Sequence, residues 1–206
     1  NLSYGTLEEK EAGYKGTAAK LITQYTKGAG FGMAPAITPG SLFTGRFEFQ
    51  AVTDPKEQLK LTKFGIPYAK KPLYFKGAFK YKAGDNFVDG SDKNDVKENT
   101  GDKDQCGIYA LLYEATNEKE EEVILDGNTI TNSEYRVAIA QIKDGSDTED
   151  KWVEFNETFT YFAGKVYDSS KKYKMAIVCS SSKAGDSFKG AVNSTLFVDE
   201  LEIIGE

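Results

Sequence analysis

A strict alternation between Leu73 and Lys82 constrains the fold of this chain more than any other stretch. One parity is apolar and the other is mostly lysine: Leu73, Phe75, Phe79 and Tyr81 against Tyr74, Lys76, Lys80 and Lys82. Successive side chains of a strand point to opposite faces of its sheet. The stretch therefore predicts a strand with one face in the core and one in water, as in antiparallel sheets.

The rest of the chain shows similar short runs, separated by turn residues such as the Asp-Gly pairs at 89–90, 126–127 and 144–145. Strands are expected within residues 17–26, 41–53, 108–113, 123–125, 137–142, 151–162, 173–180 and 196–203. No internal repeat or long amphipathic helix interrupts them. The pattern favours an all-β sandwich or barrel, with residues 17–206 as one domain and residues 1–16 as a lead-in segment or a linker from an upstream domain.

The strands at 173–180 and 196–203 are expected to form a closing hairpin, and the second of them changes phase along its length. Leu196 and Val198 share one parity, whereas Leu201 and Ile203 share the other. A bulge at Asp199-Glu200 explains this change, because one extra residue turns the later side chains back to the core. Asp199 would then point sideways toward the end of the sandwich, where it is either a hydrogen-bond cap for loop amides or a ligand of a structural Ca²⁺.

The acidic insertion at residues 89–104 also invites a Ca²⁺ interpretation. Its spacing lacks the central glycine and the terminal glutamate of an EF-hand loop, so a solvated loop is the preferred interpretation.

Charge and hydropathy exclude several partners. The net charge is −6, and only Arg46 and Arg136 among the 26 basic residues are arginines. There is no basic stripe for a nucleic acid or an anionic membrane, and no apolar stretch approaches the roughly twenty residues that cross a bilayer. Residue 1 is not methionine, so any signal peptide is absent from the sequence. We expect a monomer.

The absence of histidine removes whole classes of mechanism, including Ser-His-Asp and Cys-His nucleophiles and HExxH zinc sites. The two cysteines, Cys106 and Cys179, lie at the ends of apolar runs. They are interpreted as small buried residues, with a cross-strand disulfide as the alternative. No cofactor is required by the chemistry that remains.

Carboxylate chemistry survives this exclusion, since a glycoside hydrolase needs only two Asp or Glu residues across a sugar ring. Glu114 and Glu154 are the candidates, because they lie in strand-like segments. The alternative is that both are exposed charges at strand ends.

Sugar binding requires less, namely exposed aromatic rings with a few polar groups at their edge. The candidate ligand-binding residues are Tyr74 on the wet face of its strand, Tyr109 and Tyr113 on one face of another strand, and Trp152. Trp152 could instead fill the core, and the two tyrosines of residues 108–113 could pack between sheets.

Several segments resemble one known family. The run SSSKAGDSFKGAVNSTLFVDELEI near the C-terminus is similar to the closing signature of the putative carbohydrate metabolism domain (PCMD), a family of secreted Bacteroidetes proteins. Three earlier segments also match, in the order that the family has them: GSLFTGRF (40–47), FGIPYAKKPLYFKGAFKYKAGD (64–85) and GIYALLYE (107–114). The resemblance covers most of residues 17–204.

The resemblance implies a jelly-roll β-sandwich similar to carbohydrate-binding modules and galactose-binding-like domains. It also implies an extracytoplasmic place: secreted, periplasmic, or anchored at the outer-membrane surface as a lipoprotein. The leading hypothesis is a noncatalytic module that binds a polysaccharide or oligosaccharide. The alternatives are a glycoside-active enzyme with a carboxylate pair and a structural or adhesin-like surface domain.

Overall fold

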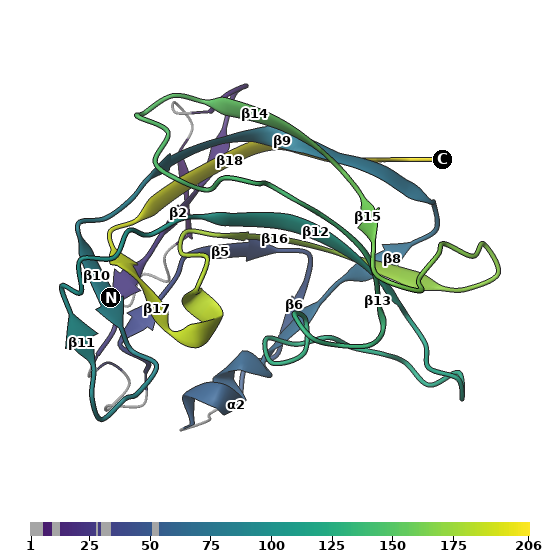
Figure 1. The fold of residues 1–206 in the computed structure, drawn as a ribbon, viewed down its shortest axis with the longest axis horizontal. Coiled ribbons are helices and arrows are strands. Elements are labelled where there is room, and N and C mark those ends of the chain that lie inside the picture. The colour runs from purple at the N-terminus through teal and green to yellow at the C-terminus, as the bar shows by residue number, and fades with distance from the viewer. Residues whose placement is uncertain (1–5, 10–12, 28, 30–33, 51–53) are drawn as a thin grey trace.

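A computed structural model of the chain describes residues 6–9, 13–27, 29, 34–50 and 54–206. The protein is nearly all β, as the sequence predicts, and two antiparallel sheets form the two layers of a sandwich (Figure 1). Smaller sheets lie at the ends and beneath the second layer. Among the described residues, no helix is long and apolar enough to cross a membrane.

The first layer is a five-stranded sheet that appears uppermost in Figure 1. Its strands, in spatial order, are β1 (Thr6–Glu9), β2 (Ala18–Ile22), β18 (Thr195–Gly205), β9 (Pro72–Lys82) and β14 (Val153–Thr158). The central pair, β18 and β9, comes from opposite halves of the chain. The sheet therefore forms only when distant segments meet.

The second layer is a six-stranded sheet. Its strands are β15 (Thr160–Tyr161), β13 (Arg136–Gln141), β12 (Gly107–Glu114), β16 (Tyr173–Ser180) and β5 (Ser41–Phe43), with β8 (Ile66–Tyr68) also paired to β16. The long partners β12 and β16 are apolar on both faces. This is possible because both faces of this sheet are covered.

The remaining elements are short. β10 (Asn86–Asp89), β11 (Lys97–Glu98) and β17 (Lys189–Val192) form a three-stranded sheet at one end of the sandwich (Figure 1). Two hairpins pair β3 (Gln24–Tyr25) with β4 (Ile37–Thr38) and β6 (Gly45–Phe47) with β7 (Thr62–Phe64). The described residues also include the helix α2 (Pro55–Leu59) and the 3₁₀ turn η1 (Gly185–Ser187).

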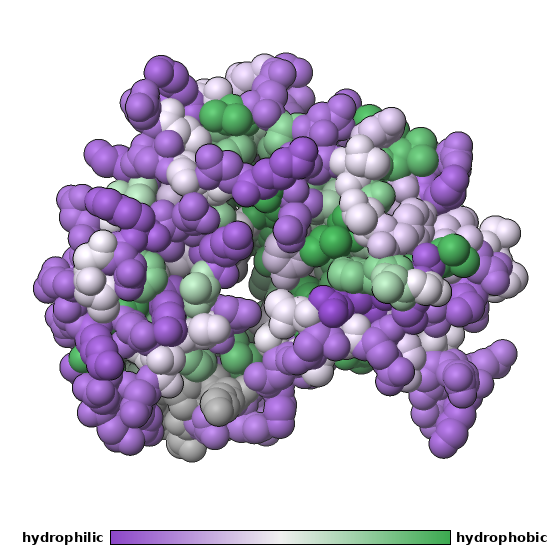
Figure 2. Space-filling model, in the orientation of Figure 1, coloured by the Kyte–Doolittle hydropathy of each residue, from purple (hydrophilic) through white to green (hydrophobic). Residues whose placement is uncertain are grey.

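The main core lies between the two layers and confirms the alternation of β9. Phe75 and Tyr81 are fully buried, Phe79 is 3% exposed, and Tyr74 on the opposite face is 41% exposed. A second apolar cluster covers the other side of the six-stranded sheet, where Leu111, Tyr113 and Val178 of the sheet meet Val123, Leu125 and Ile130 of a long loop. In Figure 2, polar side chains dominate the surface and apolar ones gather mainly near a central hollow.

The bulge in β18 is confirmed, one residue later than expected. Asp199 pairs with Ala78 and Glu202 with Lys76, so Glu200 and Leu201 together face Gly77. Glu200 takes a left-handed conformation, with φ of 53°. Leu201 and Ile203 pack against the main core as a result. Asp199 stays in register in the middle of the sheet and does not point toward its end.

Four expected elements are wrong in detail. Residues 41–53 are not one strand, because the chain passes from β5 in the second layer to β6 in a separate hairpin at Gly45, whose φ is 142°; residues 51–53 lie outside the described part. Residues 151–162 divide into β14 and β15, in different layers. The C-terminal strands β16 and β18 also belong to different layers, so they do not form a hairpin. Residues 123–125 make only an isolated bridge, from Leu125 to Phe64.

Both cysteines are free and buried in the main core, as the buried-residue interpretation predicts. Burial raises the pKa of both thiols above the ordinary value. They are therefore thiols at neutral pH and behave as small apolar residues.

A buried polar network joins four distant segments of the chain. Asp104, 4% exposed, accepts hydrogen bonds from the hydroxyls of Ser182 (2.6 Å) and Ser194 (2.7 Å) and from the Ala191 amide (2.7 Å). Its other carboxylate oxygen accepts a hydrogen bond from the backbone of Gln105. The Ser182 hydroxyl in turn lies 2.6 Å from that of Thr23. The insertion at residues 89–104, expected to be solvated, thus ends in the buried Asp104.

Candidate functional site

The outer face of the five-stranded sheet, the side away from the main core, carries the aromatic residues that lie in register with one another. Phe197 of β18 pairs with Lys20 of β2 on one side and with Lys80 of β9 on the other. Trp152 directly precedes Val153, which pairs with Phe79. It therefore continues the same row beyond Lys80.

Three rings form a continuous cluster on this face. The ring centroids of Trp152 and Phe197 are 6.4 Å apart in an edge-to-face arrangement, and those of Tyr14 and Trp152 are 5.9 Å apart. We call Tyr14, Trp152 and Phe197 the aromatic row. Each ring is partly exposed: Tyr14 is 37% exposed, and the other two are half-buried. Such distances and tilts are those that aromatic pairs prefer.

Residues 13–17, just before β2, lie over the face and add Tyr14 to this row. The Tyr14 hydroxyl donates a hydrogen bond to Glu154 of β14, and the Lys15 amide donates one to Asp199 of β18 at 2.8 Å. Ala78 lies between these two carboxylates in the register of the sheet. Tyr14 and Lys15 therefore bridge over Ala78, which accounts for its exposure of only 1% on an outward position.

The charged side chains around the aromatic row are largely paired. Lys80 contacts Asp150 at 2.9 Å, and Lys76 contacts Glu202 at 2.8 Å. The ammonium groups of Lys80 and Lys20 also lie 4.9 and 5.4 Å from the centroid of the Phe197 ring, within the range of cation–π contacts. The face thus combines apolar rings with a balanced set of charges.

Two of the four tyrosine and tryptophan candidates lie on this face. Tyr74 is exposed on β9, where it pairs with Thr158 of β14 and Ile204 of β18. Trp152 neither fills the core nor stands alone, since it sits in the aromatic row.

The other two candidates lie in the second layer. Tyr113 is fully buried in the second apolar cluster, and its hydroxyl donates a hydrogen bond to the Phe64 carbonyl at 2.6 Å. Burial raises its pKa to about 12. A ligand cannot reach this ring, so the binding role expected for Tyr113 is wrong for this structure. Tyr109 is half-buried against the same cluster. Both pack beneath the six-stranded sheet and not between the sheets.

The two candidate carboxylates lie in different layers. Glu114, at the end of β12, contacts the ammonium groups of Lys171 at 2.9 Å and Lys165 at 3.8 Å. Glu154, on β14, accepts the hydrogen bond of Tyr14. Each carboxylate is thus held by a neighbour of its own layer or loop, and the structure does not bring them into one cleft.

Asp199 has the contacts of a hydrogen-bond cap. One carboxylate oxygen accepts the Lys15 amide and the other accepts the Glu200 amide, both at 2.8 Å. In the described part of the chain, no group of three or more His, Cys, Asp or Glu residues could hold a metal ion. The capping alternative accounts for the conformation of Asp199, and the calcium role stays a prediction.

Sequence reasoning missed Phe197 and Tyr14. Phe197 lies between the inward Leu196 and Val198, so its outward position follows from the same alternation that placed those two. Tyr14 carries no such signal, because a loop residue has no periodicity from which its direction can be inferred.

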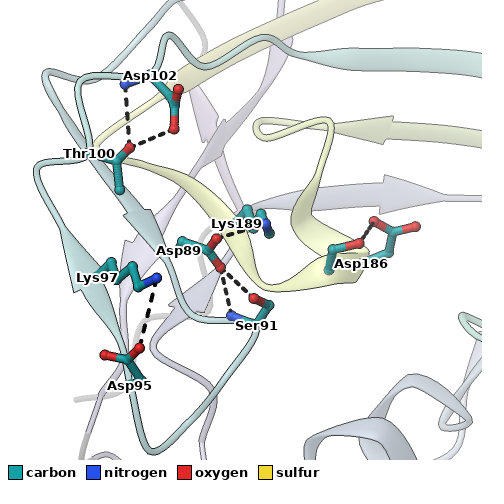
Figure 3. Close-up of polar contacts among 9 residues, drawn as sticks. Asp89, Ser91, Asp95, Lys97, Thr100, Asp102, Asp186 and Lys189 are labelled. Atoms are coloured by element: carbon teal, nitrogen blue, oxygen red, sulfur yellow. Dashed lines mark hydrogen bonds and ion pairs between the residues drawn. The ribbon is translucent and has the colours of Figure 1, made fainter.

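The acidic insertion is mostly exposed and internally hydrogen-bonded (Figure 3). Asp89 forms an ion pair with Lys189 at 2.7 Å and accepts hydrogen bonds from the hydroxyl and amide of Ser91. Thr100 and Asp102 form a similar local contact. These contacts are those of polar turns and agree with the solvated-loop interpretation of the exposed part.

The contacts of Asp89 predict a pH-dependent contribution to stability. Lys189 and Ser91 lower its pKa from 3.8 to about 2. The Asp89 carboxylate therefore takes up a proton at a higher pH in the unfolded chain than in the folded chain. Its contribution to folding stability is fully present above about pH 4 and is lost as the pH falls toward about 2. The Tm difference between wild type and Asp89→Asn should shrink as the pH falls through this window.

Asp95→Asn is the matched control, because the ion pair of Asp95 with Lys97 is exposed and 3.8 Å long. Its Tm should differ less from that of wild type at every pH. Equal Tm differences for the two variants would contradict a special contribution of Asp89.

Comparisons with known proteins place this chain among carbohydrate-related proteins. A solved structure from Bacteroides thetaiotaomicron, described as a putative glycoside hydrolase, is 38% identical, with a TM-score of 0.84, and the match covers 98% of this chain. A second, from Bacteroides vulgatus and described in the same words, is 33% identical over 98% of this chain, with a TM-score of 0.81. The match spans 57% of the first neighbour and 78% of the second.

No curated protein matches the chain. The model of the family described as "Putative carbohydrate metabolism domain" matches residues 1–204, nearly the whole sequence. The chain therefore belongs to the PCMD family.

Proposed function

We propose that this protein is a noncatalytic carbohydrate-binding module of a secreted or cell-surface glycan-handling protein. The observation that carries the proposal is the aromatic row on the outer face of the five-stranded sheet. Membership of a carbohydrate-related family and the likeness to Bacteroides proteins described as glycoside hydrolases support a sugar ligand and an extracytoplasmic place.

The chemistry of the face suits a sugar. The C–H patches of a sugar ring pack against aromatic rings, while its hydroxyls need donors and acceptors at the edge. Trp152 and Phe197 supply rings held in place by their neighbours, so little conformational entropy is lost when a ligand orders them. Glu154 and Asn156 are exposed at alternate positions of β14 after Trp152, so they supply polar groups on the same face.

A glycoside-active enzyme is the second candidate, because both solved neighbours are described as glycoside hydrolases. Glu154 lies on the outer face next to the aromatic row, where a sugar could meet it. Its expected partner, Glu114, belongs to the other layer. An enzyme acting at this face would therefore need a different second carboxylate, which makes binding without catalysis the better-supported function.

A binding screen with matched variants tests the proposal. Wild type should bind at least one polysaccharide or oligosaccharide on a glycan array, and Trp152→Ala or Phe197→Ala should weaken that binding about ten- to hundredfold. Phe49→Ala is the matched control, because this ring is 85% exposed but follows the β6 strand of a separate hairpin; its binding should be unchanged.

The same samples distinguish the two candidates. Release of reducing sugar from any polysaccharide would favour the enzyme. Equal binding by wild type, Trp152→Ala and Phe197→Ala would show that the aromatic row is not the site.

A further inference from the structure

A depression of about 360 Å³ adjoins the aromatic row at one end of the sandwich. It lies where β9 leads into β10 and β17 leads into β18, and its lining includes Lys82, Gly84, Asp85, Asn86, Val192 and Asn193. Lys82 and Thr195 form the next outward pair of the register after Lys80 and Phe197. One pair of strand residues, roughly 7 Å, therefore separates the aromatic row from the depression.

The polar side chains of this depression differ from those around the aromatic row. Lys80, Lys76 and Lys15 are each paired with a carboxylate. In contrast, the side chains of Asp85 and Asn193 are exposed, and neither has a hydrogen-bond or ion-pair partner among the described residues. Lys82 is also exposed and interacts with Asp150 only through its charge, without a hydrogen bond among those residues. An ammonium donor, a carboxylate acceptor and an amide that can do both thus border one hollow, and none of them forms a side-chain hydrogen bond within the described part of the chain.

The backbone walls of the depression are rigid. A Cβ atom on Gly84 would lie 2.0 Å from the Val192 carbonyl oxygen, so only glycine fits at position 84. The Gly84 amide donates a hydrogen bond to the Ser194 hydroxyl at 3.0 Å, and that hydroxyl donates to the buried Asp104. Asn193 between the two walls has a left-handed φ of 68°. The buried carboxylate therefore fixes both walls from below.

We propose that this depression is a subsite for about one neutral sugar residue, next to the aromatic row; this deepens the proposed function and rests on it. Its volume is at the lower end of the range for small-molecule sites. Lys82 and Asp85, the charged residues of the lining, carry opposite charges, so the lining itself favours neither an anionic nor a cationic sugar. A donor, an acceptor and an amide match neighbouring hydroxyl groups, each of which both donates and accepts hydrogen bonds.

The test uses NMR of the isotope-labelled protein with the neutral methyl glycosides of glucose, galactose, mannose and xylose, and with glucuronic acid and glucosamine as charged comparisons. At least one of the neutral glycosides should shift the backbone amides of Gly84 and Asn193 with a saturable dependence on concentration. Asn193→Gly and Asp85→Ala should each weaken that binding about tenfold. Glycine keeps the left-handed conformation of residue 193, and Asp85 is exposed, so both variants should fold. Asp186→Ala, exposed but outside the depression, is the matched control.

The outcomes separate this inference from the proposed function. Shifts at Gly84 and Asn193 that persist unchanged in both variants would overturn the subsite, as would the absence of shifts there with all four glycosides. Shifts confined to the aromatic row would overturn the subsite and leave carbohydrate binding intact. Shifts at the depression with no effect of Trp152→Ala on oligosaccharide binding would uphold the subsite and refute the aromatic row. Binding of glucuronic acid or glucosamine alone would refute the neutral ligand class.

Discussion

Replacing Asp104 with alanine should destabilise the protein by roughly 3 to 5 kcal/mol, measured as the free energy of unfolding in urea. The wild-type carboxylate accepts hydrogen bonds from two buried hydroxyls, Ser182 and Ser194, and from the buried Ala191 amide. Alanine leaves all three donors in the interior without that acceptor. Each unsatisfied buried group carries a desolvation penalty of about 1 to 3 kcal/mol.

Two further variants define what Asp104 contributes. Asp102→Ala is the matched control, because Asp102 is exposed and, among the described residues, its carboxylate accepts a hydrogen bond only from the Thr100 hydroxyl, at 2.7 Å. The effect of this variant should stay within about 0.5 kcal/mol. Asp104→Asn keeps one acceptor oxygen and should fall between wild type and alanine. If Asp104→Ala and Asp102→Ala unfold at the same urea concentration, the buried network contributes little to stability.

The sequence predicts elements whose signal is local. The alternation from Leu73 to Lys82 specifies β9 and its two faces, because side-chain direction within a strand depends only on parity. The phase change between Val198 and Leu201 specifies the bulge for the same reason. Neither inference requires knowledge of the neighbouring strand. This is why both are confirmed, although the bulge is displaced by one residue.

The sequence fails where the outcome depends on distant partners. Gly45 turns the chain from one sheet to another, but the residues on either side of it have the alternation expected of one continuous strand. Asp104 belongs by composition to an exposed acidic loop, yet hydroxyls from residues 182 and 194 surround it in the fold. Tyr113 lies on a strand that is apolar on both faces, and a loop that contains Val123, Leu125 and Ile130 covers it. Parity assigns a face, but it does not say what covers that face.

The candidate site shows the same division. Trp152 and Tyr74 could be nominated from strand position, and both lie on the outer face. The sequence could not show that Phe197 completes the row with Trp152, because the two residues are 45 positions apart and meet only through the register of β18, β9 and β14. The depression beyond them is less predictable still, since its walls are two turns brought together by a buried carboxylate.

Replacing Phe75 with alanine should cost roughly 3 to 5 kcal/mol of folding stability, whereas the same change at the adjacent Tyr74 should cost much less. Phe75 is fully buried between the layers, and its ring packs edge-to-face on Phe155 at a centroid distance of 5.0 Å. Alanine removes that contact and leaves a cavity that the surrounding sheets can fill only partly. Tyr74 is 41% exposed on the opposite face, so its loss leaves no enclosed cavity.

The pair also separates structure from function at neighbouring positions of one strand. Urea unfolding of both variants gives the stability difference, and glycan binding by folded Tyr74→Ala gives the functional one. Similar losses of stability at both positions would contradict the burial pattern of β9. Weaker glycan binding by a fully stable Tyr74→Ala would extend the binding surface along β9, because Tyr74 and Lys80 are six residues apart on the same outward parity. Unchanged binding would confine the site to the end of the sheet that carries the aromatic row.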